Sequence, residues 1–314
     1  MSAFIDGQRA HHAVELVTRT IGVSASAYYD RKVRGLSARA VRDAELLEQI
    51  RQTHERNYFA YGYRRMWKAL AREGVAAPRC QVQRLMREHQ IVGAKRRGKP
   101  WRTTIPGSER ADTPDLLERD FTAAAPNEVW VADFTYLRCW QGLMFFSFVV
   151  DVYSRRVVGW QLAPHMRTSL VQDALDMAAS ARRPDSGALT IHHCDRGSQY
   201  TSGDFTGALD EHDILASLGS TGDAYDNAMA ESFVDTFKTE LISDRVWKTR
   251  AQLEIAVVEW VGWYNNARLH SSLGDQPPAE IEAPAQGDRV GVTDSPFGLP
   301  GHAHPTPTTI TQPN

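Results

Sequence analysis

The stretch V-W-V-A-D-F-T-Y at residues 129–136 places one carboxylate, Asp133, inside a run of apolar, β-branched and aromatic residues. Residues of these types favour a β-strand that is buried on at least one face. A carboxylate in such a strand costs free energy unless its charge is paired or binds a metal ion. Asp133 is therefore a candidate metal ligand.

The segments that follow predict a mixed α/β fold. Strands at 145–152 and 156–162 come next, and three successive strands favour an antiparallel meander. Further along we expect a helix at 169–182, a strand at 188–193, a helix at 201–212, a strand at 214–217, and helices at 228–241 and 250–269.

The sequence before residue 93 predicts helices only, at 12–21, 24–28, 39–56, 63–73 and 79–89. Gly74 and Pro78 separate the last two, which is the pattern of a helix-turn-helix motif. The last helix offers side chains suited to DNA, namely Arg79, Gln81, Gln83, Arg84 and Arg87. The alternative is an ordinary three-helix bundle with a solvated basic face.

Charge is divided unevenly along the 314 residues. Residues 1–110 hold 22 Lys+Arg and 10 Asp+Glu, whereas the remainder holds 14 and 28. A basic first part is typical of a nucleic-acid-binding region. The acidic second part is easier to explain if some carboxylates hold metal cations. The basic run Lys95, Arg96 and Arg97 is either a DNA-tracking arm or a solvated tail.

Several protein classes are disfavoured. The longest apolar stretch, 143–150, is shorter than the roughly 20 residues that span a bilayer. The N-terminus has no charged region followed by an apolar core, so no secretory signal is expected. Three distant cysteines without a Cys-x-x-Cys pair favour neither disulfides nor zinc. We expect a cytoplasmic protein.

We predict five parts from these patterns. They are an N-terminal helical segment (1–35), a helix-turn-helix domain (36–92), a basic, Pro-rich linker (93–125), a catalytic core (126–283) and a disordered tail rich in Pro, Gly and Thr (284–314).

Two further carboxylates complete a candidate site. Asp195 follows a predicted strand directly, at the edge where α/β sheets tend to place their sites. Glu231 comes early in a helix that Asn227 can cap. Converging carboxylates suit Mg²⁺ or Mn²⁺. Two such ions about 3.5–4 Å apart can activate a water or a 3′-hydroxyl and stabilise the leaving oxygen in phosphoryl transfer.

Five motifs resemble the OrfB transposases of the insertion-sequence-three family, a branch of the DDE transposase and retroviral integrase superfamily. They are W-V-A-D-F-T-Y (130–136), D-V-Y-S-R-R-V-V-G-W (151–160), H-C-D-R-G-S-Q-Y (193–200), Y-D-N-A-M-A-E-S (225–232) and W-Y-N-N-A-R-L-H (263–270). Residues 61–65 and 83–86 are similar to that family's helix-turn-helix.

The resemblance implies an RNase H-like integrase core that uses Asp133, Asp195 and Glu231 as catalytic carboxylates and ligands of two metal ions. It implies metal-dependent cleavage and transfer of DNA strands at the ends of a bacterial insertion sequence, close to the nucleoid. It also implies an OrfA product or OrfA fusion as a partner, and homo-oligomers on DNA. In the family, a basic residue at the position of Lys238 contacts substrate DNA. The alternative for Lys238 is an ion pair with Asp235 or Glu240.

Other polar residues are assigned structural roles. For His193 we favour a structural role over a contact with metal or DNA, and for Asp151 an ion pair with Arg155 or Arg156. Turn and capping roles are expected for Asp223 and Asp226. A set near the C-terminus forms either a DNA-contact strip or core packing: Trp263, Tyr264, Asn265, Arg268 and His270.

Three alternative functions fit parts of this sequence. An RNase H-type nuclease or a Holliday-junction resolvase normally uses a fourth carboxylate in a different order. A retroviral-type integrase carries a His/Cys zinc module, and His11 and His12 have no nearby cysteine. A non-catalytic DNA-binding regulator stays open, although the presence of all three carboxylates favours activity.

Overall fold

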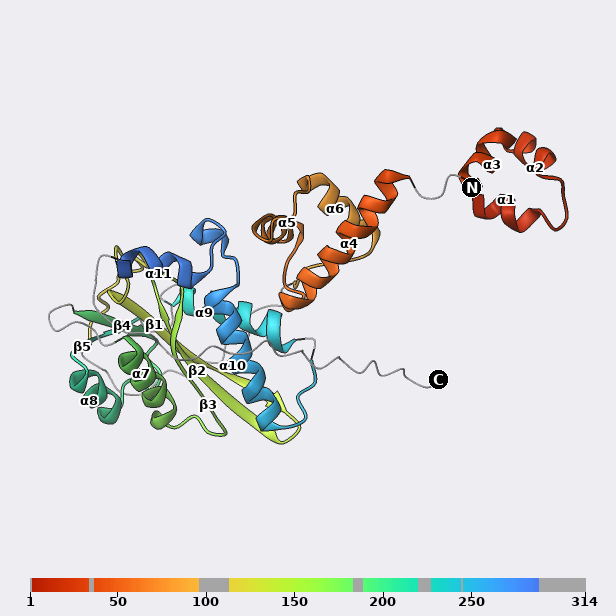
Figure 1. The fold of residues 1–314 in the computed structure, drawn as a ribbon. Coiled ribbons are helices and arrows are strands. Elements are labelled where there is room, and N and C mark those ends of the chain that lie inside the picture. Colours follow the sequence, from red (N-terminus) through yellow and green to blue (C-terminus); the bar gives the residue numbers. More distant parts are fainter. Residues whose placement is uncertain are drawn as a thin grey trace.

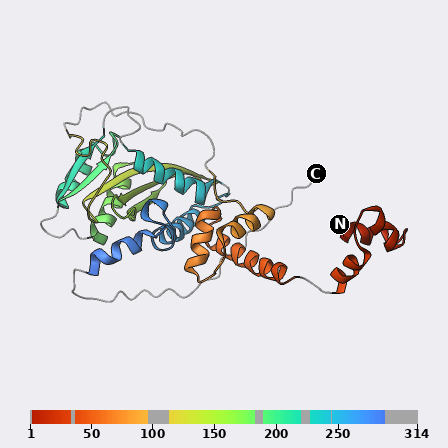
Figure 2. The same cartoon turned by 90° about the horizontal axis from the view of Figure 1, so that it is seen from above.

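A computed structural model describes residues 2–33, 37–95, 113–182, 189–219, 227–243 and 245–287. It contains a mixed α/β region built on one sheet, with an all-helical region before it in the chain (Figures 1 and 2). The predicted fold class is confirmed. In the described part of the chain, no helix is both long and apolar enough to cross a membrane.

The sheet has five strands in the order β3-β2-β1-β4-β5. They are β1 (Val129–Cys139), β2 (Gly142–Asp151), β3 (Val157–Ala163), β4 (Thr190–Cys194) and β5 (Ile214–Leu218). The first three form the expected antiparallel meander, whereas β4 runs parallel to β1 and β5 runs parallel to β4. The β1–β2 hairpin is longer than predicted because Gly142, at a φ of +114°, closes a tight turn.

Helices cover both faces of this sheet (Figure 1). On one face, α7 (Thr168–Arg182) and α8 (Gly203–Glu211) pack with Trp130 and Ala132 of β1. On the other face, α9 (Ala228–Phe237) and α10 (Arg250–Asn266) pack with Val129 and Val131. Because side chains alternate along a strand, Asp133 belongs to the face that α9 covers.

The helical region has two clusters. Helices α4 (Ala38–Arg56), α5 (Tyr63–Arg72) and α6 (Arg79–Glu88) form a bundle around Ile50, Met66, Leu70 and Val82, which are fully buried. Helices α1 (Ser2–Gln8), α2 (Val14–Thr20) and α3 (Ala25–Val33) share a small core of their own. The sequence did not predict α1, and α3 extends beyond its predicted end at residue 28.

Several predicted boundaries are wrong. The helix predicted at 228–241 ends as α9 at Phe237, and a π-helix occupies Lys238–Ile242. A short 3-10 helix (Ser271–Leu273) and α11 (Pro278–Gly287) were not predicted, and α11 passes residue 283, where the tail was expected to begin. Residues 288–314 lie outside the described part of the chain.

The second half of the predicted linker belongs to the sheet region. Leu117 is buried in its core, and the Leu116 N–H donates to Ser217 Oγ at 2.9 Å. These contacts hold the segment against β5, so residues 113–125 are not a free connection. Residues 96–112 lie outside the described part of the chain.

The three-helix bundle docks on the end of α10. The Leu269 N–H donates to the Tyr61 hydroxyl at 2.8 Å, and the Trp263 indole N–H donates to Asn57 Oδ1 at 3.1 Å. Trp263 and Leu269 also join the bundle's apolar core. These contacts bring the motif at 61–65 against the motif at 263–270.

Candidate active site

The pairing of β1 with β4 determines where the first two carboxylates lie. Trp130 is opposite His192 and Val131 is opposite His193 in this parallel pair. Asp133 and Asp195 each come two residues later, so the same register carries both side chains to one side of the sheet at the end of β4. Two residues that are far apart in sequence thereby become neighbours.

Helix α9 brings the third carboxylate, Glu231, which lies in its first turn with an exposed side chain. The helix starts beside β1 because Asn227 Nδ2 donates to the Ala132 carbonyl at 3.2 Å. Asn227 occupies the N-cap position, but its side chain accepts no hydrogen bond from the helix. The predicted side-chain cap is therefore wrong, since this amide anchors α9 next to Asp133 instead.

The three carboxylates form one electrostatic cluster. Burial and the negative charge of Asp195 raise the pKa of Asp133 to about 8, and the charge of Glu231 adds to this effect. The Phe134 N–H, which donates to Asp133 Oδ1 at 2.7 Å, and the Lys238 ammonium lower that pKa in part. The local positive charge is therefore too small to balance the carboxylates.

This donor set fits a hard divalent cation. Oxygen-only carboxylate sites suit Mg²⁺ or Mn²⁺, and a cation would relieve the repulsion that adds to burial in raising the pKa of Asp133. Within the described residues, no group of three His, Cys, Asp or Glu side chains already has the spacing of a finished metal site.

Lys238 lies beside this cluster as the first residue of the π-helix. Its Nζ is 4.9 Å from the centre of the Tyr136 ring. Burial lowers the pKa of Lys238, while the charges of Asp133 and Asp235 raise it in part. The alternative ion pair with Glu240 is wrong, because Glu240 accepts two hydrogen bonds from Arg268 at 2.8 and 2.6 Å.

The DNA-contact candidates on α6 are not equivalent. Arg84 is held by Asp43 and by Glu88, each at 2.8 Å, and it is only partly exposed. Arg87 is exposed on the same helix, and Lys95 is exposed beyond it. Arg96 and Arg97 fall outside the described residues.

Two polar residues near the sheet have structural partners. His193 is buried with its Nδ1 2.9 Å from Ser217 Oγ, which supports the structural role. Asp151 accepts the N–H and hydroxyl of Ser154, both at 2.8 Å, and the N–H of Asn127 at 2.7 Å. Its predicted ion pair with Arg155 or Arg156 is wrong, because its carboxylate instead accepts hydrogen bonds from these N–H and hydroxyl groups. Asp223 and Asp226 lie outside the described residues.

The motif at 263–270 makes structural contacts with the sheet and with the three-helix bundle. Asn265 exchanges two hydrogen bonds with the backbone of Val157, at 2.9 Å each. Arg268 and His270 are buried with Glu240, and Arg65 of α5 approaches Glu240 at 3.7 Å. These contacts support core packing over a DNA-contact strip. The sequence offered no signal that this motif would dock on the one at 61–65.

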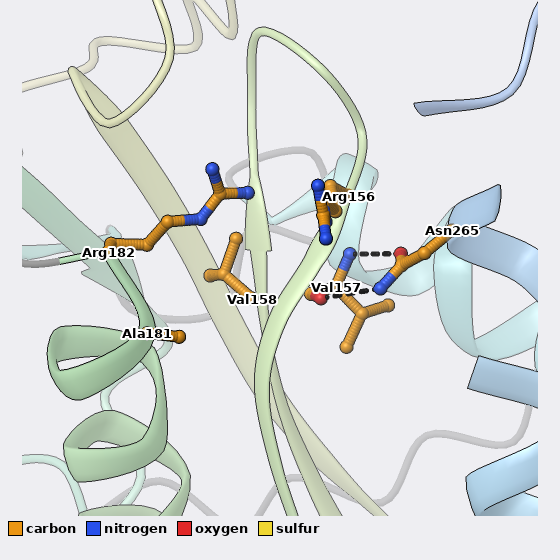
Figure 3. Close-up of a pocket in the computed structure, with 6 residues that line it drawn as sticks. All are labelled: Arg156, Val157, Val158, Ala181, Arg182 and Asn265. Atoms are coloured by element: carbon orange, nitrogen blue, oxygen red, sulfur yellow. Dashed lines mark hydrogen bonds between the residues drawn. The ribbon is translucent and has the colours of Figure 1, made fainter. Parts of the chain in front are cut away.

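A small pocket of about 180 Å³ lies beside Asn265, between β3 and the ends of α7 and α10 (Figure 3). Arg156 and Arg182 line it, and both bind Glu282 of α11, at 2.9 and 2.7 Å. None of the three carboxylates of the cluster lines this pocket. The arginines serve to hold α11 on the sheet region.

Comparisons with known proteins match this architecture. Two integrase core domain families match residues 123–224 and 212–278, and an HTH-like domain family matches residues 41–99. The transposase for insertion sequence element IS629 of Shigella sonnei is 42% identical over 287 residues, covering 90% of this chain and 95% of the relative. This chain belongs to the insertion-sequence transposases.

A second relative extends this family assignment. The putative transposase for insertion sequence element IS986/IS6110 of Mycobacterium tuberculosis is 44% identical over 266 residues, covering 83% of this chain and 95% of the relative. Among solved structures, the HTLV-2 integrase catalytic core domain in complex with magnesium aligns with 50% of this chain and 97% of its own, at 16% identity and a TM-score of 0.36.

We predict that Asp133→Asn stabilises the metal-free protein at pH 8 by about 0.5–2 kcal/mol, the range common for stabilising substitutions. Asp133 has a raised pKa, so its charge destabilises the fold as the pH rises from 3.8 towards 8. The difference in free energy of unfolding between the variant and the wild type should therefore grow across this pH window and then level off. Urea unfolding in EDTA at several pH values measures it.

Asp173→Asn, at an exposed position on α7, is the matched control and should show no such trend. Added Mg²⁺ should stabilise the wild type more than Asp133→Asn, because the variant lacks one negative charge of the carboxylate cluster. Equal stability of both proteins at every pH would contradict the electrostatic description of the cluster.

Proposed function

We propose that this chain cuts DNA strands at the ends of a bacterial insertion sequence and joins them to target DNA. The observation that carries the proposal is the cluster of Asp133, Asp195 and Glu231 on an integrase core, in which burial and then like charges raise the pKa of Asp133. The names of the relatives, which are insertion-sequence transposases, agree with it.

In this proposal the three carboxylates are the catalytic residues and hold two Mg²⁺ or Mn²⁺ ions. The bound ions supply an activated water or 3′-hydroxyl and stabilise the leaving oxygen. The chain's own groups orient the ligands: the Phe134 N–H donates to Asp133 at 2.7 Å, and the Gly197 N–H donates to Asp195 at 3.1 Å. Lys238, beside the cluster, binds a DNA phosphate near the cut.

The three-helix bundle binds the element end, with Arg87 of α6 and Lys95 as exposed contacts. The basic residues Arg96 and Arg97 extend this DNA-binding role in sequence. We assign Arg84 to holding α6 on α4, because Asp43 engages its guanidinium. The protein works in the bacterial cytoplasm at the nucleoid, with an OrfA product or as an OrfA fusion, and as a homo-oligomer on paired ends.

We predict that Glu231→Gln lowers strand cleavage and strand transfer by more than about 100-fold. Loss of groups that only support metal ligands already lowers metal affinity or activity by about 10–100-fold. The assay uses labelled element-end DNA with purified protein, fused to its OrfA if required, in Mg²⁺, Mn²⁺ or EDTA. Binding of the same DNA should persist in the variant.

Glu254→Gln removes an exposed carboxylate from α10 and should keep full activity. Cleavage by Glu231→Gln at the wild-type rate would refute the assigned roles. Tight, specific DNA binding by folded wild-type protein, with no cleavage in either metal, would instead identify a DNA-binding regulator.

We also predict that Arg87→Ala weakens binding to element-end DNA and lowers the salt dependence of log Kd by about one, as expected for one lost phosphate contact. Arg72→Ala is the matched control, because that arginine already pairs with Glu280. Fluorescence anisotropy between 50 and 200 mM salt, a range in which such contacts dominate, measures both. Equal salt slopes for Arg87→Ala and wild type would contradict this contact.

A further inference from the structure

The β1–β2 hairpin carries exposed aromatic and cationic side chains beyond the carboxylate cluster. Tyr136, Arg138 and Trp140 occupy alternate positions from β1 to the tip, and by the period of two they leave the face of the strand opposite to that of Asp133. Arg138 is exposed, and Trp140 at the turn is 73% exposed. A tryptophan stabilises a fold mainly by burial, so the fold gains little from Trp140.

A second segment, made of residues 227–243 and 245–248, runs beside β1 in the same direction. Three contacts mark its course: Asn227 to Ala132, Lys238 to Tyr136, and the Trp140 N–H to the Trp247 carbonyl at 2.9 Å. It ends where the hairpin tip lies beside the start of α10 (Figure 1). The segment therefore accompanies β1 from the carboxylates to the tip.

This segment places a cation over each of two aromatic rings. Lys238 Nζ is 4.9 Å from the Tyr136 ring, and Lys248 Nζ is 5.9 Å from the Trp140 ring. With Arg138 between them, these side chains form what we call the hairpin strip: Tyr136, Arg138, Trp140, Lys238 and Lys248.

The charge of the strip contrasts with the rest of the region. Residues 134–150 and 245–253 contain no Asp or Glu, whereas residues 111–314 as a whole hold 28 acidic and 14 basic side chains. Lys238 differs from the rest of the strip, because Asp133 and Asp235 lie close to it. The described pairing of β4 with β1 stops at Val131, and beyond that residue the second segment contacts β1 and its tip at Ala132, Tyr136 and Trp140. A positive, aromatic surface in an acidic region is complementary to a nucleic-acid strand.

We infer that the hairpin strip binds an unpaired DNA strand that leaves the carboxylate cluster, with one base stacked on Trp140. The inference rests on the proposed function, and its ligand is a strand of the element end. Stacking requires a base whose face is free, which an intact duplex does not offer. Lys238, Arg138 and Lys248 bind the phosphates along the way.

The length of the hairpin sets the reach of this contact. Seven residues separate Asp133 from Trp140, which is about 23 Å along a strand at about 3.3 Å per residue. At about 3.4 Å per nucleotide, the stacked base lies at most about seven nucleotides from the phosphate at the carboxylates. A stretched strand covers the same distance with fewer nucleotides.

The test measures binding of full-length protein to element-end duplexes by fluorescence anisotropy. The duplexes carry single-stranded overhangs of 0 to about 12 nucleotides on either strand, spanning the reach derived above. Wild type should gain affinity once the overhang reaches Trp140. Trp140→Ala should lose about tenfold of this gain, within the range for one stacked base, and Trp140→Phe should keep most of it. Leu143→Ala, exposed on the same hairpin, should match wild type.

Lys248→Ala separates stacking from charge, because it should lower the salt slope by about one while Trp140→Ala leaves the slope unchanged. If folded Trp140→Ala gains the same affinity from an overhang as wild type, the inference is overturned. A loss that is equal on overhanging and fully paired DNA also overturns it, in favour of a duplex contact. Absence of metal-dependent cleavage by wild type refutes the proposed function separately, since these affinities do not require cutting.

Discussion

The parallel pairing of β4 with β1 is the constraint on which the candidate site depends. Its register sets Val131 opposite His193 and so brings Asp133 next to Asp195 at the end of β4. A slip by one residue would turn one of these carboxylates to the opposite face of the sheet. The third carboxylate depends on the same strand, because Asn227 anchors the start of α9 on Ala132.

The carboxylate cluster destabilises the fold, and the surrounding structure limits this destabilisation. Burial and like charge raise the pKa of Asp133, while a backbone N–H and the Lys238 ammonium partly offset this. Apolar layers on both faces of the sheet keep the strands in place despite the repulsion. A fold with such repulsion at one place gains stability when a divalent cation binds there, so the electrostatics of the cluster agree with the proposed metal-dependent function.

The sequence predicted those features that depend on local pattern. The strand around Asp133 and the strand before Asp195 could be read from alternating and apolar runs, as could most helices. The use of Asn227 on β1, the pairing of Arg84 with Asp43, and the docking of the motif at 61–65 on the one at 263–270 could not. Each of these depends on which elements meet in three dimensions, and periodicity along one segment carries no such information.

The most direct test of the account is to locate metal ions in crystals of the protein with element-end DNA and Mn²⁺, using anomalous scattering. The account predicts two peaks about 3.5–4 Å apart, both coordinated within the set Asp133, Asp195 and Glu231. Their appearance would show that the β1–β4 register and α9 together build the metal site. Well-ordered carboxylates with no anomalous peak between them, or Mn²⁺ bound only elsewhere, would contradict the account.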